Sequence, residues 1–209
     1  MARLRQGASF RTGRTMAGTD LSFVQDLPLT RQAIAFARER HGDQRRDADG
    51  APFLVHPLEV AALLERSHYP DHVVAAAVLH DVLEDTDVDQ EELEAQFGPE
   101  VCHLVDVVSD DETIEDVEAR KDDVRERVRA DSSYAAAVFA ADKISKVREL
   151  RMLLANGKID AQATETKLRR YGKALDMLED ACPGSRLVEI LQFELESLEN
   201  LPPSRGSAG

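Results

Sequence analysis

The sequence contains no tryptophan, few other aromatic residues and only two cysteines. Cys102 and Cys182 lie far apart and form no CxxC pair, which excludes a disulfide-rich scaffold. The chain also lacks, near its start, an apolar stretch of about 7 to 15 residues that would serve in a secretory signal. We therefore expect a reducing, cytoplasmic location.

Long apolar runs and positive charge are also scarce. No uninterrupted apolar run reaches the roughly 18 residues that a membrane helix needs, so we expect no membrane partner. The 26 Lys and Arg residues against 40 Asp and Glu give a formal charge of −14, which argues against nucleic acid as a partner. A small anionic ligand stays compatible with this charge, because a bound divalent cation reverses the potential inside a pocket.

The chain has the composition of a helical protein. Apolar residues make up 43% and charged residues 32%, with Ala, Leu, Val, Glu and Arg dominant. Helical periodicity runs through most of the sequence, and no strand pattern of period two is present. The length of 209 residues fits one domain. We predict an all-α domain over 21–200, between a disordered basic arm (1–20) and a disordered tail (201–209).

Turn and capping residues divide this domain into helices. They are expected at 30–40, 57–66, 72–85, 89–97, 99–108, 114–129, 133–154, 163–181 and 185–198. The polar segment 42–52 is a predicted loop. The helix at 114–129 is predicted to be charged and to face the solvent.

One expected buried helix carries ionisable side chains at its end. It is apolar nearly all round over 73–79 and then places His80 and Asp81, followed one turn later by Glu84 and Asp85. On a continuous helix these four side chains fall within a sector of about 140°. Burying them is unfavourable unless something compensates. The helix therefore offers two candidate metal ligands and two further carboxylates.

Two more residues fit the same chemistry. The apolar run 134–141 places Asp142 where a core residue is expected, and His56 stands at the junction of a loop and a helix. With His80 and Asp81 they provide two imidazoles and two carboxylates. Such a set suits Mn²⁺, Fe²⁺, Co²⁺ or Zn²⁺ and leaves positions for water and a phosphate oxygen.

Each ligand taken alone has a structural alternative. A single buried His is more often a core or capping residue than a ligand. Asp142 could pair with Arg148 or Lys143, and Glu84 and Asp85 could form an ordinary solvated helix end. The joint pattern, with each His and Asp on or beside a buried helix, favours the metal site.

Five segments of the chain read HGDQRRDADGAPFLVHPLEVA, AAVLHDVLEDT, FGPEVCHLVDVVSDD, ARKDDV and AADKISKVREL. Together they resemble the hydrolase domain of the RelA/SpoT-type alarmone enzymes. The resemblance covers about residues 22–200, so the chain is most like the single-domain small alarmone hydrolases. It implies an HD-type helical bundle that holds Mn²⁺ through the four ligands above. The implied reaction is release of pyrophosphate from the 3′ position of guanosine tetraphosphate (ppGpp) or pentaphosphate (pppGpp).

The resemblance also implies roles for single residues. Glu84 and Asp85 would position and activate the attacking water. Arg45 would pack on the base, and Arg46 and Lys143 would lie near the phosphates. The full set expected to bind substrate is Arg45, Arg46, Lys143, Lys146 and Arg148.

Two positions depart from the family pattern DKLYNLR, which here reads DKISKVR. Ser145 replaces an aromatic residue, and Lys146 replaces an Asn whose paired donor and acceptor a Lys cannot copy. The base or sugar preference therefore stays open. The alternatives are an HD phosphohydrolase acting on another nucleotide, such as NADPH or a nucleoside monophosphate, and a silent nucleotide-binding regulatory domain. A homodimer is compatible with the sequence.

Overall fold

The computed structural model describes residues 21–200, and within that range the fold consists of helices and their connections. The elements are η1 (Ser22–Val24), α1 (Pro28–His41), α2 (Val55–Arg66), α3 (Asp71–Leu79), α4 (Val82–Asp85), α5 (Gln90–Phe97), α6 (Pro99–Val108), α7 (Val117–Ala130), α8 (Ser133–Ala155), α9 (Ala161–Ala181) and α10 (Arg186–Glu199). The predicted all-α class is confirmed. The predicted arm at 1–20 and tail at 201–209 lie outside the described residues.

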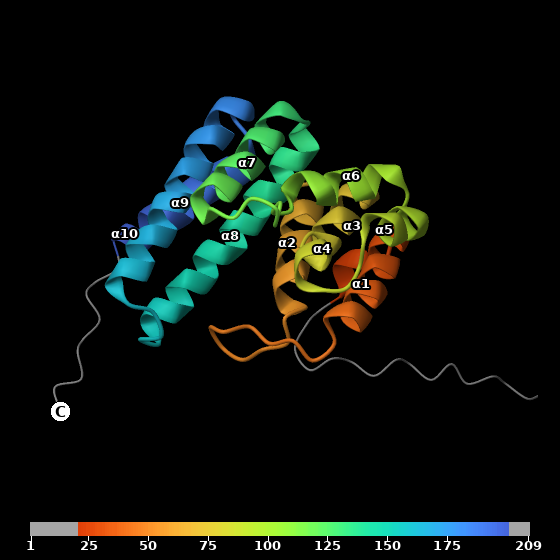
Figure 1. Ribbon diagram of the computed structural model, residues 1–209, viewed down its shortest axis with the longest axis horizontal. Coiled ribbons are helices and arrows are strands. Elements are labelled where there is room, and N and C mark those ends of the chain that lie inside the picture. Colours follow the sequence, from red (N-terminus) through yellow and green to blue (C-terminus); the bar gives the residue numbers. More distant parts are fainter. Residues whose placement is uncertain (1–20, 201–209) are drawn as a thin grey trace, which may run out of the picture.

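Helix α8 forms the wall shared by two groups of helices. It packs against α2, α3 and α6 on one side and against α9 and α10 on the other, as Figure 1 shows. Helix α3 lies inside the first group, in contact with α1, α2 and α6. Every residue of α3 from Val73 to Leu79 is buried, which explains why this helix is apolar all round.

The start of α1 is held by a residue far away in sequence. The carboxylate of Asp71 accepts the backbone N–H groups of Leu29 and Thr30, both at 2.9 Å, and the Thr30 hydroxyl at 2.6 Å. Asp71 thus satisfies donors that the first turn of a helix leaves free. The helix predicted to start at residue 72 begins one residue earlier, at Asp71 itself, directly after Pro70.

The single helix predicted over 72–85 is interrupted. Helix α3 ends at Leu79, and α4 begins at Val82. Between them, the ring of His80 donates from Nδ1 to the Ala77 carbonyl oxygen at 2.8 Å. Asp81 has φ −99° and ψ 0°, away from ordinary helical values. The interruption turns these two side chains to positions that a straight helix would not give them.

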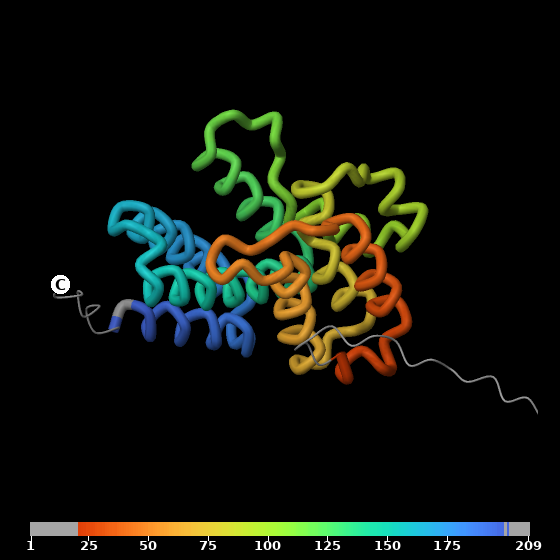
Figure 2. Tube along the Cα trace, turned by 90° about the horizontal axis from the view of Figure 1, so that it is seen from below, coloured from red at the N-terminus to blue at the C-terminus, as the bar shows by residue number. Residues whose placement is uncertain are grey.

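The predicted loop between α1 and α2 folds back on itself. It contains the one pairing of extended backbone among the described residues, an isolated bridge between Arg45 and Pro52. Lys158, after α8, donates from Nζ to the backbone carbonyl oxygens of Asp47 and Ala48 at 3.2 and 3.0 Å. Figure 2 shows the loop lying toward α8. The loop is therefore tied to the second group of helices.

Most helix limits agree with the prediction to within a few residues. Helix α2 begins at Val55, so that His56 lies in its first turn. Helix α7 begins at Val117, later than predicted, because the Asp116 side chain accepts the Ala119 N–H at 2.7 Å and caps the helix there. Over residues 21–200, no helix combines the length and apolarity needed to cross a membrane.

Candidate metal centre

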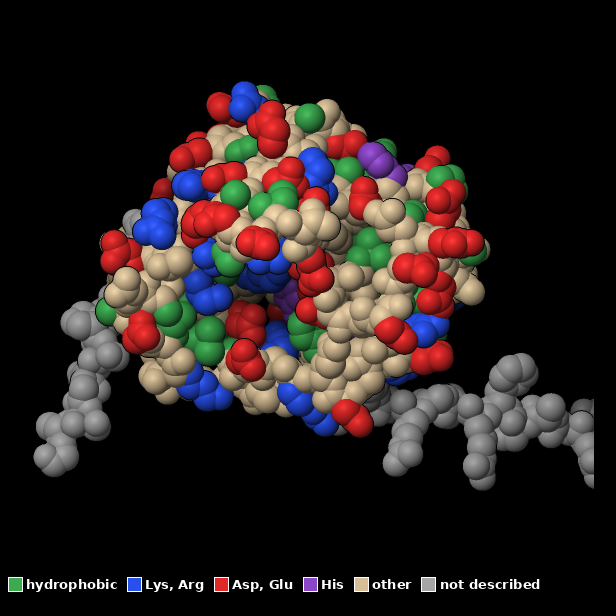
Figure 3. Space-filling model, in the orientation of Figure 1, with side chains coloured by type: hydrophobic (Ala, Val, Ile, Leu, Met, Phe, Trp, Pro, Cys, Tyr) green, Lys and Arg blue, Asp and Glu red, His purple; other side chains and the backbone are tan. Residues whose placement is uncertain are grey.

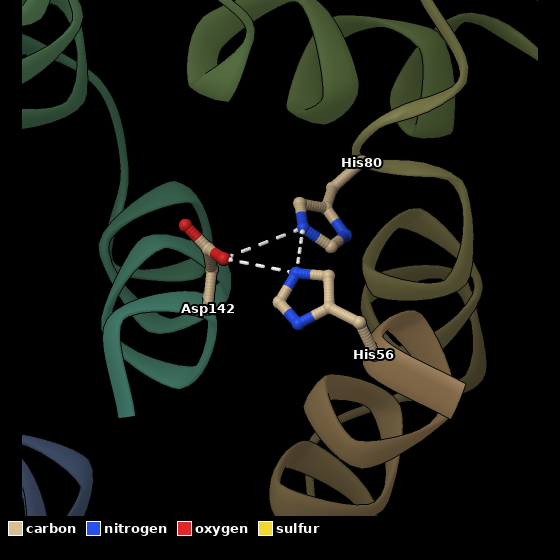
Figure 4. Close-up of side chains that lie close together, drawn as sticks. All are labelled: His56, His80 and Asp142. Carbon is tan, nitrogen blue, oxygen red and sulfur yellow. Dashed lines mark hydrogen bonds and ion pairs between the residues drawn. The ribbon is translucent and has the colours of Figure 1, made fainter. Parts of the chain in front are cut away.

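Two buried histidines face each other inside the bundle. The Nε2 atoms of His56 and His80 are 3.2 Å apart, and Figure 4 shows the two rings side by side. The Nδ1 atom of His80 donates to the Ala77 carbonyl oxygen. This bond leaves the lone pair on Nε2, the nitrogen that faces His56. A backbone carbonyl on the outer nitrogen is a common way to orient an imidazole that binds metal.

Two aspartates join the histidines. Asp142 Oδ1 lies 3.2 Å from His56 Nε2 and 3.5 Å from His80 Nε2, and Figure 4 shows this carboxylate facing both rings. Asp81 Oδ2 lies 3.4 and 3.2 Å from the same two nitrogens. The structure thus brings together the four side chains that the sequence singled out as ligands.

The donor set fits a divalent metal ion. Ligand atoms that each lie about 2.1 Å from one ion lie about 3.0–3.4 Å from their neighbours. Three of the four distances from the aspartates to the histidines, 3.2–3.4 Å, match this spacing, and the fourth, from Asp142 to His80, is slightly longer at 3.5 Å. The ligand atoms of His56, His80 and Asp142 all lie within 4.8 Å of one another. Asp142 Oδ1 is buried and makes no hydrogen bond, as expected of an oxygen that serves as a ligand.

Two lysines of α8 stabilise the aspartates in their ionised form. Lys143 Nζ lies 2.6 Å from Asp142 Oδ2, and Lys146 Nζ lies 3.2 Å from Asp142 Oδ1 and 4.0 Å from Asp81 Oδ1. Burial alone would raise the pKa of Asp142, but the two ammonium groups outweigh it and hold this pKa well below its ordinary value. The carboxylate is therefore ready to bind a cation.

The two acids of α4 have the opposite shift. Burial, and then the negative charge of Asp81, raise the pKa of both Glu84 and Asp85. Glu84 Oε1 also accepts the backbone N–H of Asp110 at 2.9 Å, which fixes its position. Glu84 is therefore a fixed carboxyl with a raised pKa beside the candidate metal ligands, an arrangement that suits proton transfer.

A pocket of about 210 Å³ opens beside His80, Asp81 and Asp142 and is lined by basic side chains from three helices. These are Lys121 and Arg125 of α7, Lys143 and Lys146 of α8, and Lys167 and Arg170 of α9. Figure 3 shows a hollow in this face with Lys and Arg side chains inside it. The positive charge is local, since the chain as a whole carries −14.

Four of these basic residues were missed by the sequence prediction. Lys121 and Arg125 belong to the helix that was expected to face the solvent, yet Arg125 is buried. Lys167 and Arg170 follow at a helical spacing of three. A spacing of three or four marks residues on one helix face, but it does not tell which face lines a pocket. The segment ARKDDV could have indicated one of them, because it is part of the family resemblance and contains Lys121.

The two loop arginines have different surroundings. Arg45 is exposed and lines a second pocket of about 300 Å³ together with Phe53, His56 and Asp85. Arg46 also borders this pocket, but its guanidinium is buried. The Arg46 Nε donates to Asp49 Oδ1 at 3.2 Å. Of these two loop arginines, Arg45 is therefore the one that extends its side chain into solvent beside the candidate metal centre.

Arg148 is the predicted substrate-binding residue that the fold does not bring to the site. Its Nε donates to Glu194 Oε1 of α10 at 2.7 Å, and Arg151 binds the other oxygen of the same carboxylate at 2.6 Å. Arg148 lines neither of the two pockets beside the metal ligands. Its position supports a role in joining α8 to α10.

Comparisons with known proteins identify relatives of this chain. The chain is 39% identical over 129 residues to mouse guanosine-3′,5′-bis(diphosphate) 3′-pyrophosphohydrolase MESH1, which covers 60% of this chain and 72% of that protein. It is 37% identical over 143 residues to the Xenopus tropicalis protein of the same name, over 67% and 79% of the two chains. A solved structure described as a metazoan ortholog of SpoT that hydrolyses ppGpp matches with a TM-score of 0.72. Its sequence identity is 29%, over 84% of this chain and 97% of that one.

A family model for the HD domain matches residues 33–168. This range contains the first candidate ligand, His56, and the last, Asp142. It also contains the acids of α4 and most of the basic pocket. The chain therefore belongs to the HD domain family.

Proposed function

We propose that this chain is a metal-dependent hydrolase that releases pyrophosphate from the 3′ position of ppGpp and pppGpp, leaving GDP and GTP. The observation that carries the proposal is a set of metal ligands opening into a pocket with six basic side chains, in a chain of formal charge −14. Positive charge concentrated beside a metal suits a substrate with several phosphates. The names of the mouse and Xenopus relatives support the same reaction.

The proposed ion is Mn²⁺. The residues that would hold it are His56, His80, Asp81 and Asp142. Their mixed nitrogen and oxygen atoms suit Mn²⁺ but also Fe²⁺, Co²⁺ and Zn²⁺. When bound, such an ion neutralises phosphate charge and lowers the pKa of water.

Glu84 and Asp85 are proposed to move the proton. In the reaction, a water oxygen forms a bond to phosphorus, and the bond between phosphorus and the 3′ oxygen breaks. One proton leaves the water, and one reaches the 3′ oxygen. The raised pKa of both carboxyls brings them closer to the pH at which a carboxyl can accept and return a proton.

The basic pocket is proposed to bind the phosphates, with Lys143 and Lys146 nearest to the metal ligands and Lys167 farther out on α9. Arg45 is proposed to stack on the base, since a guanidinium plane can pack on an aromatic ring. The Arg46 guanidinium is bound to the carboxylates of Asp49 and Glu59, and we propose that it holds the loop between α1 and α2 in place. Two free cysteines among the described residues support the proposed cytoplasmic location.

A second candidate function is hydrolysis of another nucleotide, with release of inorganic phosphate. Lys146 is the observation that favours it, because an ammonium group lies 3.2 Å from Asp142 Oδ1 where the alarmone pattern has an amide. This change alters the contacts available to a base or sugar. A silent regulatory domain is disfavoured by the intact pair Glu84 and Asp85, whose negative charges lie next to that of Asp81 and would repel it without a cation.

The test is to incubate the purified chain with ppGpp, with and without Mn²⁺, and to separate the products by anion exchange. We expect GDP and pyrophosphate only when Mn²⁺ is present. Asp142→Ala should lose both metal and activity, whereas Asp87→Ala, at an exposed position, should keep both. Phosphate released from other nucleotides, with ppGpp untouched, would establish the second candidate. Stabilisation by ppGpp without turnover would establish the silent domain.

A further inference from the structure

A line of hydrogen bonds leads away from the candidate metal centre on the outer side of His56. The Nδ1 atom of His56 lies 3.0 Å from the hydroxyl oxygen of Ser145, a residue of α8 that is 1% exposed. The Ser145 hydroxyl in turn donates to Glu59 Oε2 at 2.8 Å. Three side chains from two helices thus form one continuous connection.

The chemistry of these groups fixes the direction of each bond. An ionised carboxylate only accepts, and a hydroxyl has one proton to donate. Because Ser145 gives its proton to Glu59, its oxygen must accept from His56 Nδ1. The neutral ring then carries its proton on Nδ1 and its lone pair on Nε2, the atom that faces His80 and Asp142.

A buried arginine holds the far end of the connection. The Nη1 atom of Arg46 lies 3.3 and 3.4 Å from the two carboxylate oxygens of Glu59, and Arg46 is itself bound to Asp49. These contacts fix the position of the Glu59 carboxylate. The loop between α1 and α2 is thereby connected to a ligand of the metal.

We propose that Ser145 and Glu59 are positioning residues that hold His56 in the tautomer and orientation needed to bind a divalent ion. The proposal rests on the metal site of the proposed function and adds residues that neither the ligand pattern nor the family resemblance indicated. Hydrogen bonds of this kind to the outer nitrogen of a ligating His typically change metal affinity by about 10- to 100-fold.

The test is a calorimetric titration of metal-free protein with MnCl₂, without substrate. We expect Ser145→Ala and Glu59→Ala each to weaken Mn²⁺ binding by about tenfold. The double variant should be no weaker than either single variant, because both act through the same bond to His56. Glu65→Ala removes a carboxylate from the same helix as Glu59 and serves as the control, with an unchanged Kd.

Each outcome decides the proposal. Single variants whose Kd for Mn²⁺ stays within twofold of that of the unsubstituted chain would overturn it. A double variant whose Mn²⁺ affinity falls about a hundredfold would also overturn it, because two independent effects multiply. Glu59 is 41% exposed in its side chain, so its variant tests the connection even where the buried Ser145 variant folds poorly. A chain that binds Mn²⁺ as expected but leaves ppGpp intact would overturn the proposed function alone. A chain that takes up no Mn²⁺ would overturn both.

Discussion

Among single residues, Glu84 combines a fixed position with a raised pKa. Glu84→Gln keeps the shape of the side chain but removes its ability to carry a proton. We expect the turnover of ppGpp to fall about a hundredfold or more, while the Kd for Mn²⁺ changes little. Steady-state kinetics and calorimetry on the same preparation measure both quantities. A Glu84→Gln chain with full turnover would show that another group moves the proton.

The same substitution has a consequence for stability that depends on pH. The folded pKa of Glu84 is raised, so the fold favours the protonated form, and this favourable contribution is lost as pH rises through the folded pKa. Glu84→Gln should therefore raise Tm at pH 8 and have a smaller effect near pH 5. About 1 kcal/mol corresponds to roughly 2–4 °C in a chain of this size.

The measurement is thermal unfolding in the presence of a chelator at the two pH values. Glu91→Gln replaces an exposed carboxylate and should leave Tm unchanged at both. Equal shifts for Glu84→Gln at pH 5 and pH 8 would contradict the assigned direction of the pKa.

The four candidate ligands could be singled out in the sequence because each interrupts or borders an apolar segment. Asp142 follows a run of buried residues, and His80 and Asp81 follow another. Ser145 could not be recognised in this way. In the sequence, Ser145 stands out only because the family pattern has an aromatic residue at this position. Its hydrogen bond joins it to His56, which lies 89 positions earlier. Only the packing of α2 against α8 reveals it.

At the scale of whole elements, periodicity and capping residues predicted the helices and most of their limits. The interruption between α3 and α4 was missed because the prediction used the hydrophobic pattern. That pattern does not show the hydrogen bond from the His80 ring to the Ala77 carbonyl oxygen. The cap of α1 was missed for a related reason. Asp71 lies 41 positions after Thr30, and local capping rules consider only neighbouring residues.

This distant cap predicts a stability effect. Asp71→Ala leaves the N–H groups of Leu29 and Thr30 without their carboxylate, and a lost cap typically costs about 0.5–2 kcal/mol. We expect Tm to fall by about 1–8 °C, measured by circular dichroism. Asp87→Ala removes an exposed carboxylate and should leave Tm nearly unchanged. A Tm for Asp71→Ala equal to that of the control would mean that the cap contributes nothing.

At the scale of the whole molecule, the sequence led to two of the six basic residues of the pocket, Lys143 and Lys146, but not to the pocket as a whole. Its cations come from α7, α8 and α9, and the first and last of them, Lys121 and Arg170, lie 49 positions apart. Each of these helices also carries acids, so no segment looks strongly basic. The overall charge of −14 points to repulsion of phosphates, and the fold reverses this locally by turning basic faces of three helices toward one space.

Lys167 tests the use of this pocket. It lines both pockets beside the metal ligands, and hydrogen bonds to charged groups contribute about 1.5–3 kcal/mol. We expect Lys167→Ala to raise KM for ppGpp about tenfold or more, with a smaller change in kcat. Lys173→Ala removes a lysine from the same helix that lines neither pocket and should keep both constants. Equal kinetics for the two variants would place the phosphates elsewhere.

The shared wall formed by α8 implies a mechanical role for the ligand. The pocket is bordered by α4 and the two residues just before it on one side and by α7 and α9 on the other, so a molecule bound there contacts both groups of helices at once. Amide hydrogen exchange should then slow in α9 as well as in α4 when substrate or product is present, although α9 carries no metal ligand. Binding at the site would thus be detected as slower amide exchange in α9, a helix on the opposite side of α8.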